Sequence, residues 1–243
     1  MPASPVPAAP AGAVPALVTL HLWRVPGHRV PGAVVRMATH RARLRRTAGL
    51  TFGRLLGTGH GRTFTLRDAD PYRWGLLACW SSAAHATAFE RSPAVRSWRR
   101  AADEEWRVDL RPLASRGRWA GRTPFGDPPA ATWDGAVAAL TRARIVPRRA
   151  ATFWRAVPPV AADLHTRDGL LAAVGVGEAP VGLQGTFSVW RSDRHLTEFA
   201  YRGAAHADAI RRTGQERWYA EELFARFAVL RSAGTYGGRD PVA

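Results

Sequence analysis

Two short stretches decide the fold of this chain, because they spell the same pattern. Residues 117–124 read Gly-Arg-Trp-Ala-Gly-Arg-Thr-Pro, and residues 234–241 read Gly-Thr-Tyr-Gly-Gly-Arg-Asp-Pro. Both follow G-x-(W/Y)-x-G-R-x-P, at an offset of 117 residues. A pattern that recurs near the middle and the end of a 243-residue chain indicates an internal repeat, which has to be recognised before any element is assigned.

Further matches lie upstream of these two stretches and fall in the same order. They pair residues 80–82 with 190–192, 57–59 with 175–177, and 25–26 with 146–147. The offset between paired segments drifts from 110 to 121 residues, as insertions in loops would make it. We place one insertion at 59–72 in the first copy and one between 199 and 230 in the second.

Hydrophobic periodicity gives each copy the same series of elements. The first copy predicts a strand at 17–25, a helix at 33–48, strands at 52–59 and 73–80, a helix at 83–102 and a strand at 106–113. The second predicts a strand at 137–146, a helix at 149–165, strands at 170–177 and 181–190, a long helix at 194–227 and a strand from 228 onward. Each copy is therefore a βαββαβ, or ferredoxin-like, unit.

A ferredoxin-like unit covers one face of its sheet with helices and leaves the other face bare. Two units in one chain can cover each other, so we predict an α+β fold of tandem ferredoxin-like repeats that form a dimeric-α+β-barrel-type fold within one chain. The predicted organisation is a disordered leader at 1–15, a first repeat at 16–125 and a second repeat at 133–243. Two unrelated α+β domains joined at 121–132 are the alternative.

Composition limits the class of protein. The chain carries 35 basic residues, all of them arginine, against 19 acidic ones, for a net charge of +16. This surplus suits an anionic partner such as nucleic acid, an acidic membrane or cofactor carboxylates, although the even spread of the arginines points to coding bias. One cysteine excludes a disulfide framework, and no run reaches the roughly 18 apolar residues of a membrane span. We expect a soluble, cytoplasmic protein.

Functional residues are expected where the two copies differ in kind. In the third strand of the first copy, Trp74, Leu76 and Ala78 alternate on one face; at an offset of 110 the second copy has Gln184, Thr186 and Ser188. Three polar side chains at period two predict a polar-lined pocket on that sheet face. The plainer alternative is that serine and threonine are ordinary strand residues.

A second difference lies in the helix that follows this strand. Phe199, Gly203, His206 and Ile210 share one helical face, and His206 has small neighbours and no counterpart in the first copy. A core histidine bonded to a carbonyl is one explanation. We favour the other, an axial haem ligand, because a lone imidazole suits a metal that a macrocycle holds.

The other titratable side chains form no recognisable catalytic or metal motif. Cys79 matches Val189 and is expected to pack as a small hydrophobe. The remaining histidines lack metal-ligand spacing, and for most of them we predict a solvated position: His21, His28, His40, His60, His85, His165 and His195.

Several longer strings are similar to the spheroidene monooxygenase family, and the likeness covers nearly all of 17–241. They are SRGRWAGRTPF at 115–125, ALTRA at 139–143, FWRAVP at 153–158, GVGE at 175–178, TFSVW at 186–190, HADAI at 206–210 and WYAEELFARF at 218–227. The resemblance implies a haem-dependent monooxygenase, an oxidoreductase that inserts oxygen from dioxygen into a linear carotenoid or similar apolar substrate. It implies haem b with its iron, and a ferredoxin-type electron donor.

The resemblance also assigns roles to residues of this chain. His206 would be the iron ligand, and Gln184, Thr186 and Ser188 would be catalytic, orienting oxygen on the other side of the haem. Arg142 and Arg116 would pair with the haem propionates, since a guanidinium suits bidentate carboxylate contacts. Four further residues would contact the cofactor or line the substrate channel: Gly203, Ile210, Phe187 and Trp154.

Other functions stay open at this point. They are a cofactor-free barrel oxygenase, a non-catalytic haem carrier, and a haem enzyme of the aldoxime dehydratase or chlorite dismutase kind. A tandem RNA-binding module is a further alternative, but residues 184–190 match its stacking motif only at Gly185 and Val189. We therefore expect no nucleic-acid partner. Peripheral membrane association and a homo-oligomer are both compatible with the sequence.

Overall fold

A computed structural model describes residues 12–61, 68–150, 152–153, 163–178, 183–202 and 218–243. The elements of the first half are, in chain order, β1 Leu17–Arg24, η1 Gly27–Arg29, α1 Val30–Leu44, β2 Leu50–Gly59, β3 Ala69–Trp80, α2 Ala83–Glu90, α3 Pro93–Ala101 and β4 Glu104–Gly117. Those of the second half are β5 Val137–Ile145, η3 Pro147–Arg149, β6 Leu170–Gly177, β7 Leu183–Trp190, α5 Asp193–Arg202 and β8 Tyr219–Gly234.

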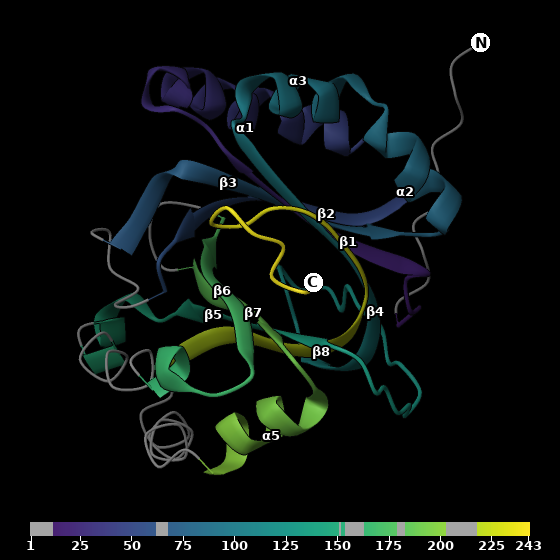
Figure 1. The fold of residues 1–243 in the computed structure, drawn as a ribbon, viewed down its shortest axis with the longest axis vertical. Coiled ribbons are helices and arrows are strands. Elements are labelled where there is room, and N and C mark those ends of the chain that lie inside the picture. Colours follow the sequence, from purple (N-terminus) through teal and green to yellow (C-terminus); the bar gives the residue numbers. More distant parts are fainter. Residues whose placement is uncertain (1–11, 62–67, 151, 154–162, 179–182, 203–217) are drawn as a thin grey trace.

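The eight strands form one closed antiparallel barrel in the order β1-β3-β2-β6-β7-β5-β8-β4. The strands of the two halves follow the same internal order, β4-β1-β3-β2 and β8-β5-β7-β6. Helices α1, α2 and α3 cover one outer side of the barrel and α5 covers the opposite side (Figure 1). The α+β class and the barrel that the repeat predicted are thus observed.

Apolar side chains from both halves fill the barrel interior. Trp106, Phe187 and Phe227 are among its largest fully buried side chains, and Trp119 and Phe125 enter from the segment after β4. The sheet face on which an RNA-binding module would stack bases lies in this core, which speaks against that alternative. Among the described residues, no helix has the length and apolar character that crossing a bilayer requires.

The prediction of a helix as far as residue 227 is wrong, because β8 already begins at Tyr219. Alanine, glutamate and leucine favour a helix locally, but Leu223, Ala225 and Phe227 alternate into the barrel core. β8 pairs with β5 on one side and β4 on the other. Pairing on both edges and burial at period two override the local helix preference.

Two predicted helices of the first half also differ from the structure. The predicted helix at 83–102 is split into α2 and α3, because Ser92 takes extended backbone before Pro93 and caps α3 by accepting a hydrogen bond from Val95 N. Helix α1 begins three residues before the predicted start and ends at Leu44. The helix predicted at 149–165 falls mostly outside the described residues.

The last residues of the predicted leader, 12–15, already contact the rest of the protein. Gly12 accepts a hydrogen bond from Asp127 N, and Pro15 is buried.

Candidate functional site

The alternate residues of β7 face two different compartments. Phe187 and Val189 point into the barrel core. Ser188 and Trp190 point outward toward α5, where Phe199 stacks on Trp190 with ring centroids 5.1 Å apart. Thr186 has the same parity as Ser188 and shares this outward face. The site that sequence analysis predicted between sheet and helix therefore corresponds to the outer face of the second half.

Large side chains fill the equivalent outer face in the first half. The register pairs Trp23 with Trp74, and His21 with Leu76. Trp23 also stacks on Trp98 of α3 with ring centroids 5.3 Å apart. The space left beneath these helices has a volume of about 10 Å³, which is at the lower limit of what one water requires. Protein alone closes this layer.

Small side chains occupy the corresponding positions in the second half. Where the first half pairs Trp23 with Trp74, the second half pairs Ala143 with Gln184. Where the first half pairs His21 with Leu76, the second half pairs Thr141 with Thr186. On the next strand, Leu55 becomes Gly175. Each replacement removes volume from the layer between sheet and helix.

Thr141 gives direct evidence that this layer is open. It lies on β5, a central strand between β7 and β8, yet its side chain is exposed. Its counterpart His21 is 0% exposed. Exposure in the middle of a sheet means that, within the described part of the chain, no other residue covers the Thr141 side chain. Thr141 and Thr186 therefore form a polar, solvent-accessible part of the outer face of the second half.

The two hydroxyl groups of β7 differ in what they contact. Ser188 is buried, and its Oγ accepts a hydrogen bond of 2.9 Å from Trp190 Nε1. In the first half, Trp80 Nε1 donates to Thr19 Oγ1 at the same distance, so Ser188 serves the scaffold. Thr186 is half-buried and its hydroxyl contacts no partner among the described residues, which leaves it directed at the open layer.

Of the two arginines predicted to bind propionates, only Arg116 reaches the outer face. Its guanidinium lies over the Phe224 ring, 4.7 Å from the centroid. Phe224 pairs with Thr141, and Thr141 pairs with Thr186. Arg116 is exposed at the end of this row of side chains across the sheet, so its charge is available to a ligand there.

Arg142 and Phe187 lie on the opposite sheet face, and this corrects their predicted roles. Arg142 is buried at one end of the barrel interior, pairs with Glu221 and lies over the Trp119 ring. Its charge is already balanced inside the core. Phe187 makes an edge contact with Trp106 in the same core. Both were misplaced because period-two alternation sends neighbouring residues of a strand to opposite faces.

Several predicted site residues cannot be placed. His206, Gly203, Ile210 and Trp154 lie outside the described residues, as does the side chain of Gln184. Phe199 is the described member of the stripe that includes His206, and it faces the sheet as predicted.

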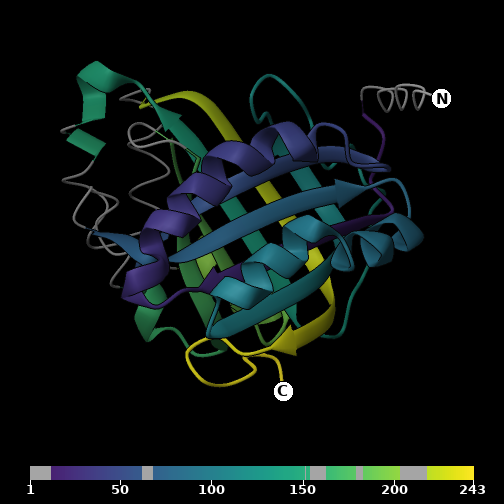
Figure 2. The same cartoon turned by 90° about the horizontal axis from the view of Figure 1, so that it is seen from above.

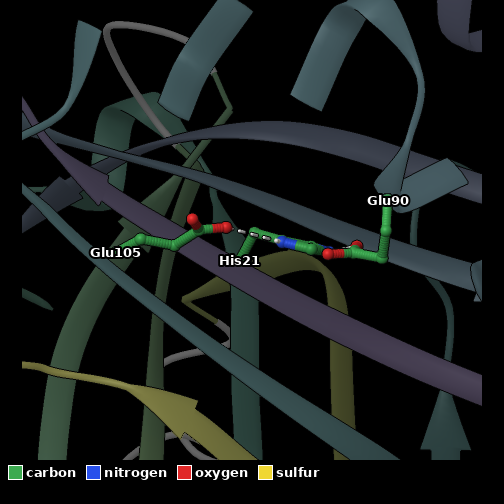
Figure 3. A group of neighbouring side chains, drawn as sticks. All are labelled: His21, Glu90 and Glu105. Carbon is green, nitrogen blue, oxygen red and sulfur yellow. Dashed lines mark ion pairs between the residues drawn. The ribbon is translucent and has the colours of Figure 1, made fainter. Parts of the chain in front are cut away.

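A charged cluster that sequence analysis missed surrounds His21 in the first half. Figure 3 shows its imidazole between two carboxylates: Nε2 lies 3.3 Å from Glu90 and Nδ1 lies 3.9 Å from Glu105. Four of the histidines predicted to be solvated are exposed, namely His28, His60, His85 and His165. His21 and His40 differ from the others because both are buried. Burial raises the pKa of Glu105, but the neighbouring His21 and the hydrogen bonds that Arg99 donates more than offset it and hold that pKa at about 2.

The chemistry of this cluster does not fit a metal ion well. His21, Glu90 and Glu105 are close enough to share an ion, but the two carboxylates face different ring nitrogens. Arg99 and Arg107 also contact the two oxygens of Glu90, at 2.5 and 2.9 Å. Two guanidinium groups beside the carboxylate repel a cation, so we interpret the cluster as a charge network that joins α2 and α3 to the sheet.

Cys79 packs in the barrel core, as does Val189, its counterpart in the second half. Burial raises the pKa of its thiol far above the usual value. The thiol therefore stays protonated, and the predicted role as a small hydrophobe is confirmed.

Curated relatives match over most of the chain. A spheroidene monooxygenase of Rhodobacter capsulatus is 34% identical over 231 residues, covering 93% of this chain and 95% of the relative. One of Rubrivivax gelatinosus is 40% identical, covering 79% and 73%. The chain belongs to the spheroidene monooxygenase family. No family model matches the sequence.

Solved structures support the fold of this member of the spheroidene monooxygenase family. An aldoxime dehydratase is 12% identical, with a TM-score of 0.57, over 88% of this chain and 80% of that one. A second, solved in complex with butyraldoxime, is 11% identical with a TM-score of 0.60, over 88% and 79%. At this identity the likeness extends to the fold alone.

Sequence analysis of this family member missed Thr141. Its counterpart in the first strand of the first copy is His21, and the change from histidine to threonine was visible once the two strands were aligned on their register. The third strands of the two halves, taken alone, identify Thr186 but not its cross-strand neighbour Thr141.

Proposed function

We propose that this protein is a haem-dependent monooxygenase that inserts one oxygen atom of dioxygen into a linear carotenoid. Family membership supports the reaction and the substrate class, because three curated relatives are named spheroidene monooxygenase. The observation that carries the cofactor proposal is the exposed Thr141 in the middle of the second-half sheet.

The sheet side of this layer supports the cofactor proposal. Ala143 and Thr141 stand where the first half has Trp23 and His21, and the Thr141 side chain is exposed. Arg116 at the end of the row offers a positive charge to a propionate. We propose that His206 is the iron ligand, that Gly203 and Ile210 contact the haem, and that Trp154 lines the substrate channel, as the family resemblance implies.

The residues of this chain would bind, orient and shield the reactants. Bound haem b would supply the iron chemistry that activates dioxygen, with electrons from a ferredoxin-type donor. The hydroxyl of Thr186 is placed to donate a hydrogen bond into the layer, with that of Thr141 next to it. The stacked rings of Trp190 and Phe199 would shield one side of the layer from water. Gln184 remains a candidate for the same polar wall.

We further propose that the two halves are diverged copies of one ferredoxin-like unit. Both have the same strand order, and the register that pairs Leu17 with Trp80 pairs Val137 with Trp190. Gly117 and Gly234 each take positive φ, where a Cβ would meet a carbonyl oxygen of the facing strand at 2.2 and 2.1 Å. Shared steric demands at matching turns support common descent.

The cofactor proposal is tested by absorption spectroscopy of protein produced with ample haem. We expect a Soret band in the wild type that is lost or displaced in His206→Ala. His195→Ala is the control, because His195 belongs to α5 and bonds to Ser192. An unchanged band in His206→Ala would refute the ligand assignment.

The reaction is tested separately with a linear carotenoid, a reduced ferredoxin and ¹⁸O-labelled dioxygen. Mass spectrometry should find one labelled oxygen atom in the product. Product whose oxygen comes from water, or no product from a haem-loaded preparation, would contradict a monooxygenase.

A further inference from the structure

Helix α1 exposes apolar side chains on the outside of the barrel, and nothing in the described structure covers them. It lies across the outer side of the first-half sheet (Figure 2). Ala33, His40 and Leu44 form its buried face. On its outer face Val34 and Val35 are 52% and 60% exposed.

A third exposed hydrophobic side chain lies near the turn that precedes this helix. Val34 and Val35 are two of the five large hydrophobic side chains that are exposed among the described residues. Tyr72 is another, and its ring would be 3.7 Å from a Cβ on Gly27, in the turn before α1. The adjacent valines and this tyrosine give α1 and its preceding turn an apolar outer side.

The same helix and the residues after it carry a surplus of positive charge. Arg41, Arg43, Arg45 and Arg46 are exposed, and none of them lies within ion-pair distance of a described carboxylate. By contrast, Arg99 and Arg107 on the same half are paired with Glu90. The sequence has no acidic residue before Asp68, so the local surplus is built into this part of the chain.

We infer that α1 docks on an anionic lipid membrane, with Val34, Val35 and Tyr72 entering the interface and the arginines contacting lipid headgroups. An interfacial helix combines an apolar strip with basic residues in this way, and each arginine adds attraction to anionic lipid. A nucleic acid would contact the arginines but would leave the valines exposed to water. A second copy of this chain would bring two basic surfaces together, and these would repel each other.

This inference rests on the surface alone and extends the proposed function. A carotenoid dissolves in bilayers rather than in water, so an enzyme that acts on one benefits from a membrane-bound position. Because vesicle binding needs neither haem nor turnover, its failure would leave the spectroscopic test of the cofactor untouched.

The test is flotation of the purified protein with vesicles of phosphatidylcholine alone or mixed with phosphatidylglycerol. We expect binding to the mixed vesicles only. The triple variant Arg43→Gln, Arg45→Gln, Arg46→Gln should bind them roughly a hundredfold more weakly, at about fivefold per arginine. The matched control removes three other exposed arginines, Arg118, Arg231 and Arg239, and should bind within a few-fold of the wild type.

The double variant Val34→Ser, Val35→Ser separates a membrane from other polyanions. It should lose vesicle binding while its retention on a heparin column stays unchanged. Equal weakening by both triple variants would mean that net charge alone drives binding and would overturn the proposal. Vesicle binding unaffected by the valine changes, together with tight binding to single-stranded RNA, would identify a nucleic-acid surface instead.

Discussion

Thr186 is the residue on which the proposed oxygen chemistry depends most. It shares the open layer with Thr141, whereas Ser188 is engaged by Trp190. Period-two alternation on β7 was enough to predict both hydroxyls on one face. It could not tell which of them is free, because the bond from the Trp190 indole depends on side-chain conformations in the fold.

Thr186→Val removes the hydroxyl and keeps the shape of the side chain. We expect the turnover number to fall by roughly ten- to a hundredfold, the loss of one hydrogen bond that forms in the transition state, with haem content unchanged. Ser188→Ala is the control, which should cost about 1–3 kcal/mol of stability by leaving an indole N–H unpaired and keep its rate. Equal rates in the wild type and Thr186→Val would remove Thr186 from the mechanism.

Glu105 gives the first half an acid-sensitive contact. Its pKa of about 2 lies below the ordinary value of 4.5, so the ionised carboxylate is favoured by folding. Such a group stabilises the protein fully above the unfolded value, and this contribution is lost as pH falls from about 4.5 toward 2.

Thermal unfolding between pH 6 and pH 2 tests this assignment. Glu105→Gln should lower the melting temperature at pH 6 and flatten its dependence on pH in the acid range. Asp127→Asn, in an exposed loop, is the control and should keep the wild-type slope. A variant curve parallel to that of the wild type would show that Glu105 has no such role.

At the scale of elements, most strands were predictable and the helix boundaries were not. The ranges of β1, β5 and β6 follow directly from alternation. The break between α2 and α3 was also visible, as Ser92 before Pro93. The start of β8 was predicted too late because its composition favours a helix, although the offset of 117 residues from β4 placed a strand there.

Helix α3 anchors the filled layer of the first half through Trp98, which is 2% exposed and stacks on Trp23. Trp98→Ala should destabilise the protein by about 3–5 kcal/mol, as measured by urea unfolding, while haem affinity should stay unchanged because the proposed haem site lies in the other half. If the variant does not fold, Trp98→Phe provides a milder test, with a smaller loss of stability and again no change in haem affinity. A loss of haem affinity in a folded variant would place the cofactor against the first half.

At the scale of the whole molecule, one scaffold is used in two ways. The sequence repeat predicted the closed barrel because each apolar sheet face that no helix covers can be buried against the other. The core shared by both halves around Trp106 and Phe187 is consistent with this prediction. The third strands alone predicted that one outer layer is polar-lined and the other apolar. The loss of large side chains on the neighbouring strand appears only when the register of the first strands is known, as with Trp23 and its counterpart Ala143.

The central claim is that protein fills the outer layer of the first half and a flat cofactor fills that of the second. Ala143 lies on the same outer face as Thr141 and is 5% exposed, and Ala143→Trp introduces the indole that the first half has at Trp23. The most direct measurement is a haem titration of the apoprotein followed by absorbance, with exposed Ala131→Trp as the control. The account predicts that Ala143→Trp folds and loses at least tenfold in haem affinity while the control binds as the wild type does; a folded Ala143→Trp variant with undiminished affinity would contradict it.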